Sequence, residues 1–175
     1  MKKLAILTLL ALEIAVCGCG NSKPSDTVST STSGNWEAQL TGGTGGASQL
    51  NFVTSFSVTN SGPLSITGFG FINAGPCFST TLNAENESGS ATFATDSTGA
   101  VTGTLTYSVQ SSGGNSLSLS GNLTGNSNGT TTTTGTLSNG VVAGTWQLTG
   151  GQGDPSCTGT GDFIMCQGTN TCTVP

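Results

Sequence analysis

The sequence contains no histidine and no arginine, and only three of its 175 residues are lysine. Two of these lysines, Lys2 and Lys3, lie at the N-terminus, so Lys23 is the only basic residue in the rest of the chain. Without histidine, the chain lacks the residue on which Ser-His-Asp catalysis, Cys-His catalysis and the usual histidine-containing zinc sites depend. Without a set of basic residues it has no means of neutralising phosphates, which excludes nucleic-acid binding.

Charged residues of either sign make up only 6% of the chain, whereas glycine alone contributes 28 residues. Such a composition resembles that of disordered proteins, but those lack β-branched and aromatic residues in register. Here apolar and polar residues alternate, most clearly from Leu50 to Val58, where Phe52 and Phe56 share one side. Alternation with a period of about two residues predicts β-strands with one buried and one solvent-facing side.

An apolar stretch from Leu4 to Val16 follows the N-terminal lysines. It is shorter than the roughly 20 apolar residues of a transmembrane helix and has the length of a signal-peptide core. Val16-Cys17-Gly18-Cys19 then resembles the lipobox of bacterial lipoproteins. The resemblance implies that residues 1–18 are a signal peptide and that Cys19 carries the lipid, palmitate included. An ordinary signal peptide without a lipid and a retained membrane anchor are the alternatives.

The polar residues 20–33 are typical of a flexible tether between an anchor and a folded domain. Gly20, directly after the lipid-bearing cysteine, is compatible with sorting to the outer membrane. We therefore expect a membrane-anchored protein of the bacterial cell envelope, with residues 19–33 as lipid-anchored Cys19 and tether. Residues 34–175 are expected to form one domain.

The domain is predicted to be all-β, with about eight to ten antiparallel strands. Turn sequences rich in glycine and asparagine, such as Ser138-Asn139-Gly140, separate the alternating segments, and no helical crossover is visible. A closed up-and-down barrel would cover the sheet edges, with a β-sandwich as the alternative. The expected strands lie around Trp36–Leu40, Leu50–Val58, Leu64–Ile72, Ala91–Phe93, Val101–Val109, Leu117–Leu123, Thr130–Leu137, Val142–Leu148, Phe163–Met165 and Thr171–Val174.

Gly34-Asn35-Trp36, at the start of the first expected strand, resembles the Gly-x-Trp that opens lipocalin-type barrels. Gly144-Thr145-Trp146-Gln147-Leu148 is similar to strands of small lipocalin-like bacterial lipoproteins. The order of lipobox, tether and β-domain resembles Gly/Thr/Ser-rich bacterial lipoproteins of uncharacterised role. The resemblance implies a lipocalin-like barrel that holds a small apolar ligand. The recurrence of glycine two residues before an aromatic residue has a simpler explanation, relief of crowding beside a large core side chain.

Four cysteines follow the anchor, and an even number in an exported chain predicts two disulfides. Three connectivities are possible for four cysteines. A turn-like sequence separates Cys166 from Cys172, which favours a bridge across a terminal hairpin and leaves Cys77 to pair with Cys157. A metal site at these cysteines is not expected, because CxxC spacing and histidine are both missing.

The remaining candidates for chemistry are carboxylates. Glu85, Glu87 and Asp96 form a carboxylate set of the kind used in glycoside hydrolysis, and with Asp154 and Asp162 they are also the candidates for calcium. Two glutamates spaced by one residue are more simply neighbours on one side of a strand, and the usual calcium-loop pattern is missing. We therefore expect no catalytic residue, no metal and no cofactor.

Two further patterns bear on binding. The run Thr130–Thr134 would present hydroxyls to ice or sugar, although an exposed β-edge explains it more simply. Most aromatic residues are expected in the core, since exposed ones would indicate a carbohydrate platform or a ligand mouth. These aromatic residues are Trp36, Trp146, Phe52, Phe56, Phe69, Phe71 and Phe163.

The sequence therefore predicts a monomeric, non-enzymatic envelope lipoprotein whose β-domain is structural or binds a partner. A lipocalin-like carrier of a small apolar ligand is one alternative. A surface adhesin or carbohydrate-binding module, with a glycan as partner, is the other.

Overall fold

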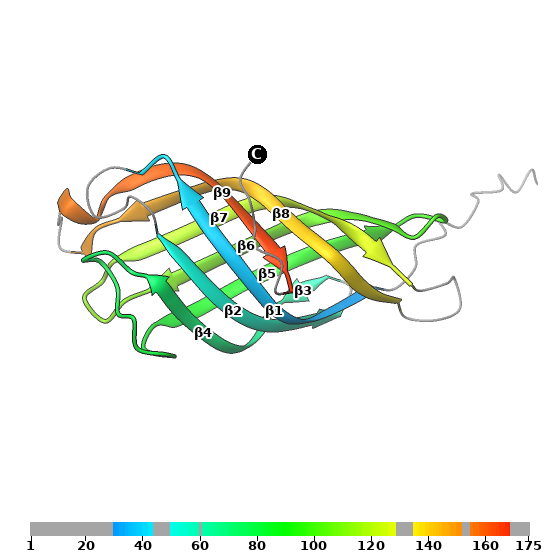
Figure 1. The fold of residues 1–175 in the computed structure, drawn as a ribbon, viewed down its shortest axis with the longest axis horizontal. Helices are drawn as coiled ribbons and strands as arrows, with labels where there is room; N and C mark the ends of the chain where they lie inside the picture. Colours follow the sequence, from blue (N-terminus) through cyan, green and yellow to red (C-terminus); the bar gives the residue numbers. More distant parts are fainter. Residues whose placement is uncertain (1–29, 44–49, 60, 129–134, 152–154, 169–175) are drawn as a thin grey trace, which may run out of the picture.

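The computed structural model describes residues 30–43, 50–59, 61–128, 135–151 and 155–168. These residues form nine strands and the short 3-10 helix η3 (Figure 1). The elements are β1 (Thr30–Thr41), β2 (Asn51–Thr59), β3 (Gly62–Pro63), β4 (Ser65–Asn73), β5 (Asn86–Thr95), β6 (Ala100–Gln110), β7 (Ser116–Ser127), β8 (Gly135–Thr149), η3 (Pro155–Cys157) and β9 (Gly159–Gln167).

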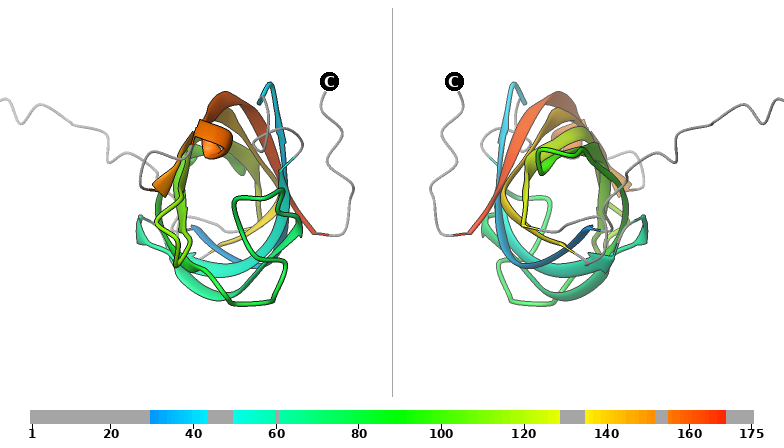
Figure 2. Two further views of the ribbon diagram at one scale, coloured as in Figure 1. Left: turned by 90° about the vertical axis from the view of Figure 1, so that its left-hand side faces the viewer. Right: turned by 90° about the vertical axis from the view of Figure 1, so that its right-hand side faces the viewer.

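All nine strands belong to one sheet that curls into a nearly closed barrel, seen end-on in Figure 2. Strands β5 to β9 lie side by side in chain order, and β9 is followed around the barrel by β1, β2 and β4. Neighbouring strands are antiparallel, except that β1 also makes a short parallel contact with β8. The prediction of an antiparallel up-and-down barrel is confirmed, and the two-sheet sandwich is not what forms.

One stretch of chain brings the two edges of the sheet together. In β3, Gly62 lies opposite Ala91 of β5, and the Leu64 amide then donates to the Gly89 carbonyl at 2.9 Å. From Ser65 onward the chain pairs with β2 instead. Because β3 and β4 follow each other directly, the same segment borders both edges and limits the exposed strand edge.

The last residue of β9, Gln167, holds a junction where the end of β9 and the start of β1 meet β8. Its Oε1 accepts from the Gly140 amide at 3.2 Å, while its Nε2 donates to the Leu137 carbonyl at 3.1 Å and to Thr32 Oγ1 at 3.2 Å. Beyond this point β1 pairs with β8 directly, with Thr30 opposite Gly135. One carboxamide thus ties three strands together where the ninth strand stops.

Two strand boundaries differ from the sequence-based expectation. β8 is continuous through Ser138–Gly140, where the sequence predicted a turn, because the pairing with β7 shifts register there and Asn139 takes a left-handed φ of 53°. A bulge can absorb such residues without ending the strand. β1 begins at Thr30, so residues 30–33, expected in the tether, belong to the barrel wall. Of the predicted strand Thr130–Leu137, residues 135–137 form the start of β8 and the rest lies outside the described residues, as does the predicted strand Thr171–Val174.

Side chains that face the barrel axis form one cluster of buried apolar residues. Phe52 is fully buried, and its ring centroid lies 5.1 Å from that of Phe69 and 5.6 Å from that of Tyr107. Trp36 stacks on Phe56 at 5.2 Å. The aromatic residues expected in the core are all buried, namely Trp36, Trp146, Phe52, Phe56, Phe69, Phe71 and Phe163.

Two glycines make room for tryptophan side chains, and one of them, Gly161, belongs to the recurrent glycines that precede an aromatic residue. A Cβ at Gly140 would lie 2.5 Å from Cη2 of Trp36, and one at Gly161 would lie 2.7 Å from Nε1 of Trp146. Real Cβ atoms do not approach side chains so closely, so these positions make room for the indole rings. Relief of crowding therefore explains Gly161, whereas a Cβ at Gly34 would meet nothing within 4 Å and the left-handed φ of 117° is what favours glycine there.

Candidate functional site

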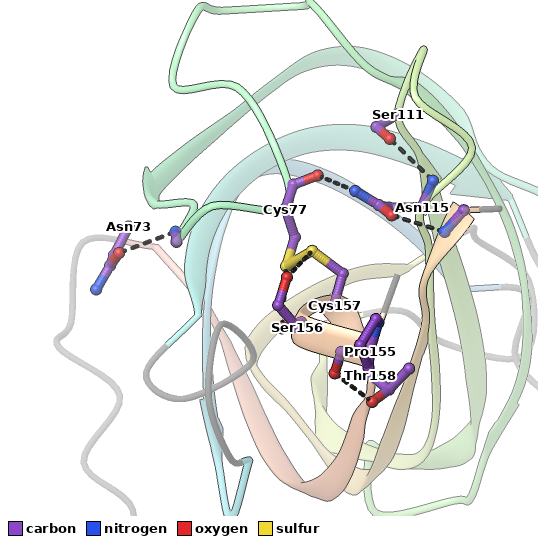
Figure 3. The surroundings of a disulfide bond; sticks show 10 residues. Asn73, Cys77, Ser111, Asn115, Pro155, Ser156, Cys157 and Thr158 are labelled. Carbon is purple, nitrogen blue, oxygen red and sulfur yellow. Dashed lines mark hydrogen bonds between the residues drawn. A yellow bond between two sulfur atoms is a disulfide. The ribbon is translucent and has the colours of Figure 1, made fainter. Parts of the chain in front are cut away.

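A disulfide between Cys77 and Cys157 closes one end of the barrel (Figure 3). The two Cα atoms are 5.5 Å apart, and both cysteines are buried. Asn115 reinforces this end, because its Nδ2 donates to the Cys77 carbonyl at 2.7 Å and its Oδ1 accepts from the Gly151 amide at 2.7 Å. The pairing predicted from the sequence is confirmed, and it joins the segment after β4 to η3.

This closed end lies opposite the end at which the described chain begins. Ser31 pairs with Thr59 at the last residue of β2, and Thr30 pairs with Gly135 at the first residue of β8. The disulfide lies beyond the opposite end of β8, because Cys157 belongs to η3, which follows β8 in the chain. A chain that arrives at Thr30 from an anchor therefore leaves the disulfide end as the remote end of the barrel.

The remaining cysteines are only partly described. Cys166, on β9, is half-buried and takes part in a disulfide. Its expected partner Cys172 and the expected lipid-bearing Cys19 both lie outside the described residues. The pairing of Cys166 with Cys172 and the lipidation of Cys19 therefore stay predictions.

Glu85 and Glu87 lie close to the closed end, at the start of β5. Glu85 is buried, and its Oε1 accepts a hydrogen bond from the Ser79 amide at 2.7 Å. Oε1 of Glu87 is also buried, but it has no hydrogen-bond partner. Desolvation raises the pKa of Glu87 above its ordinary value, and the neighbouring charge of Glu85 adds to the effect. All three lysines of the chain lie outside the described residues, so no basic side chain of the described barrel offsets these carboxylates.

We expect Glu87→Gln to stabilise the protein at neutral pH and to leave it little changed at acidic pH. Because the folded-state pKa of Glu87 is raised, its contribution to stability is fully present below its ordinary pKa of 4.5 and is lost as the pH rises through the folded value. Glutamine stays neutral and avoids this loss. Urea unfolding of both proteins across the pH range measures the difference.

Asp96→Asn is the matched control, because Asp96 is expected to affect the free energy of unfolding with the opposite pH dependence. Hydrogen bonds from the Thr98 hydroxyl and amide, and from the Ala100 amide, lower the pKa of Asp96 below its ordinary 3.8. Its contribution is therefore present above that value and is lost as the pH falls. Identical pH dependence for the Glu87 variant and the wild type would contradict the assignment of Glu87 as a partly buried carboxylate with a raised pKa.

Those of the other predicted carboxylates that the structure describes do not join this pair. Asp96 lies in the turn between β5 and β6, and Asp162 is exposed on β9, while Asp154 lies outside the described residues. Among the residues that the structure describes, no three His, Cys, Asp or Glu side chains gather in a way that would hold a metal ion.

Tyr107 places a hydroxyl inside the barrel, which sequence reasoning did not single out. Its hydroxyl lies 2.7 Å from Thr54 Oγ1, and Thr54 donates in turn to the Gly68 carbonyl at 3.1 Å. Burial raises the pKa of Tyr107, so the phenol stays neutral. The pair satisfies its own hydrogen bonds within the core and therefore has a structural role.

An apolar groove lies on the outer wall, a feature that the sequence analysis also missed. Its apolar rim consists of Val53, 39% exposed, and Leu82, 71% exposed, with Glu37 and Asn83 among its polar residues. The groove has a volume of about 450 Å³. Val53 is an apolar residue at a solvent-facing position of the alternation, which is the one sequence signal that would have pointed to it.

Comparisons of the chain with protein-family models, with curated proteins and with solved structures found no match. The nearly closed barrel is compatible with the lipocalin-like domain that the Gly-x-Trp motif indicated. Within the described ranges, no helix is long and apolar enough to span a membrane.

Proposed function

We propose that this chain is a non-enzymatic lipoprotein of the bacterial cell envelope, anchored by lipid at Cys19, which displays its barrel as a structural or partner-binding domain. The observation that carries the proposal is the packed barrel axis. Phe52, Trp36 and Tyr107 occupy positions where a carrier would hold its ligand. The outer wall and the barrel ends are therefore the surfaces available to a partner.

The orientation of the barrel fits an anchored display domain. The chain enters at Thr30, and the opposite end is closed by the Cys77–Cys157 bridge and the Asn115 hydrogen bonds. Disulfides persist in oxidising compartments such as the periplasm and the cell surface. An acidic barrel would also be repelled weakly by an anionic membrane surface, which favours a domain that faces water.

A lipocalin-like carrier of a small apolar ligand is the second candidate, favoured by the barrel topology and by the apolar groove. Binding of a hydrophobic fluorophore to the protein separates the two functions. The display function predicts that the fluorophore does not bind at micromolar concentration. Uptake that survives substitution of both Val53 and Leu82 by serine would place the probe inside the barrel and favour the carrier.

The anchor is tested by metabolic labelling with palmitate. We expect the wild type and a Cys17→Ser variant to be labelled and Cys19→Ser to remain unlabelled, because Cys19 occupies the acylated position of the lipobox. Globomycin, which inhibits lipoprotein signal peptidase, should block maturation of the labelled precursor. Processing that continues in globomycin without palmitate incorporation would overturn the lipoprotein assignment.

A further inference from the structure

The outward face of strands β5 to β9 carries mainly small polar side chains, and its larger apolar residues, Val141 and Ile164, are half-buried. Cross-strand rows of serine and threonine run from one strand to the next, for example Ser90, Thr106 and Ser120. Asp162 is the only charged side chain at the exposed outward positions of β7, β8 and β9. The large apolar side chains that are exposed in the described residues, Val53, Ile72 and Leu82, all lie outside these strands.

Two parts of this face differ in how their hydroxyls are used. Between β5 and β6 the hydroxyls bond to each other, with Ser90 Oγ 2.9 Å from Thr106 Oγ1 and Thr92 Oγ1 2.8 Å from Thr104 Oγ1. Such pairs satisfy their own hydrogen-bonding groups and stabilise the sheet. Hydroxyls paired in this way have less hydrogen-bonding capacity left for a ligand.

Strands β7, β8 and β9 carry a different arrangement, which we call the polar groove. Six exposed side chains form two rows of three across these strands, and the groove has a volume of about 480 Å³. Neighbouring side chains of such a grid lie about 4.8 Å apart across strands and about 7 Å apart along them. The rows are Ser118–Gln147–Thr160 and Ser120–Thr145–Asp162.

The side chains of the polar groove retain hydrogen-bonding capacity. Ser118 Oγ makes one long bond of 3.5 Å to the Gln147 carbonyl. Within the described part of the chain, the side-chain polar atoms of Gln147, Thr145 and Asp162 make no hydrogen bond of their own. A carboxylate, a carboxamide and several hydroxyls thus face solvent together.

The floor of the groove is held in place from within. Trp146, buried between the two rows, donates its Nε1–H to the Thr41 carbonyl at 2.9 Å. Thr41 Oγ1 donates to the Asp162 carbonyl at 3.2 Å. These bonds tie β8 and β9 to β1, so the polar side chains project from a rigid surface, which lowers the entropy lost when a ligand binds.

We propose that the polar groove binds a neutral glycan. The carboxylate, with no basic side chain on β7 to β9, disfavours anions, and the absence of large exposed apolar side chains from these three strands disfavours hydrophobic ligands. A neutral sugar chain offers the complementary chemistry, because its hydroxyls donate to Asp162 and exchange donors and acceptors with Gln147 and the serine and threonine hydroxyls. This proposal rests on the proposed function and names neutral glycans as the class of partner that the displayed barrel binds.

The test uses the full-length lipidated protein in a detergent without a sugar headgroup. Maltohexaose, cellohexaose, laminarihexaose and chitohexaose are titrated separately by calorimetry and by NMR shift mapping. We expect at least one of them to bind with a Kd of about 0.1–1 mM. Asp162→Asn is expected to weaken binding by about tenfold, because a charge-assisted bond is replaced by a neutral one.

Thr106→Val on the self-bonded hydroxyl pair is the matched control, and it should leave glycan affinity unchanged. Urea unfolding of each variant shows that the fold is intact. The inference is overturned if none of the four glycans binds at millimolar concentration, or if Asp162→Asn and Gln147→Ala bind as tightly as the wild type. Palmitate labelling does not depend on any glycan, so failure of this test leaves the anchored-display proposal to be decided separately.

Discussion

Replacement of both Cys77 and Cys157 by serine is expected to lower the free energy of unfolding by roughly 4 kcal/mol, because the bridge spans 80 residues of sequence. A link between such distant residues removes many conformations from the unfolded chain. It also holds the segment after β4 against η3 at the closed end. Urea unfolding of the oxidised wild type and the double variant measures the difference.

The serine replacement of Cys166 and Cys172 is the matched control. If these two cysteines pair as the sequence predicts, their short loop stabilises the protein by only about 2 kcal/mol on the same entropy model. The long bridge should therefore matter more than the short one. An equal or larger loss in the control would contradict this order and would show that closure of the long loop is not the main effect of the disulfides.

Phe52→Ala is expected to destabilise the protein by about 3–5 kcal/mol, the usual range for removing a fully buried phenylalanine. Phe52 is completely buried and lies among Phe69, Phe71 and Tyr107, all within 6 Å between ring centroids. Close packing around a deleted ring collapses only in part, so an apolar cavity should remain on the barrel axis.

This variant also tests whether the wild-type barrel is packed. Apolar cavities of this kind bind benzene, so the variant should be stabilised by benzene and the wild type should not. Ile72→Ala, at a position 55% exposed, is the control and should change stability by no more than about 0.5 kcal/mol. Stabilisation of the wild type by benzene would contradict the packed interior and would favour a carrier.

Much of the fold followed from local patterns. Alternation from Leu50 to Val58 placed Phe52 and Phe56 on the buried side, as the structure has them. Turn spacing indicated hairpin-linked neighbours, and the resulting meander is the barrel itself.

Other features depended on contacts between distant segments. The turn expected at Ser138–Gly140 became a bulge because β7 pairs with β8 on both sides of it, while β1 pairs with β8 before it and β9 after it. The apolar groove forms where Leu82, from the segment after β4, packs over Gly70, which pairs with Val53 of β2. A Cβ at Gly70 would lie 2.5 Å from the Leu82 side chain, so only glycine leaves room for this contact. The bulge has no local signature, and Val53 at a solvent-facing position is the one local sign of the groove.

The sequence by itself determined that this protein is all-β, that it lacks the residues for histidine-based catalysis and phosphate binding, and that Cys77 pairs with Cys157 if the other two cysteines bridge a hairpin. Only the tertiary structure decided that the barrel axis is packed and that Gln147 lies between Ser118 and Thr160. The physical reason is register. Alternation assigns each side chain to a face, but hydrogen bonding between strands decides which side chains on that face become neighbours.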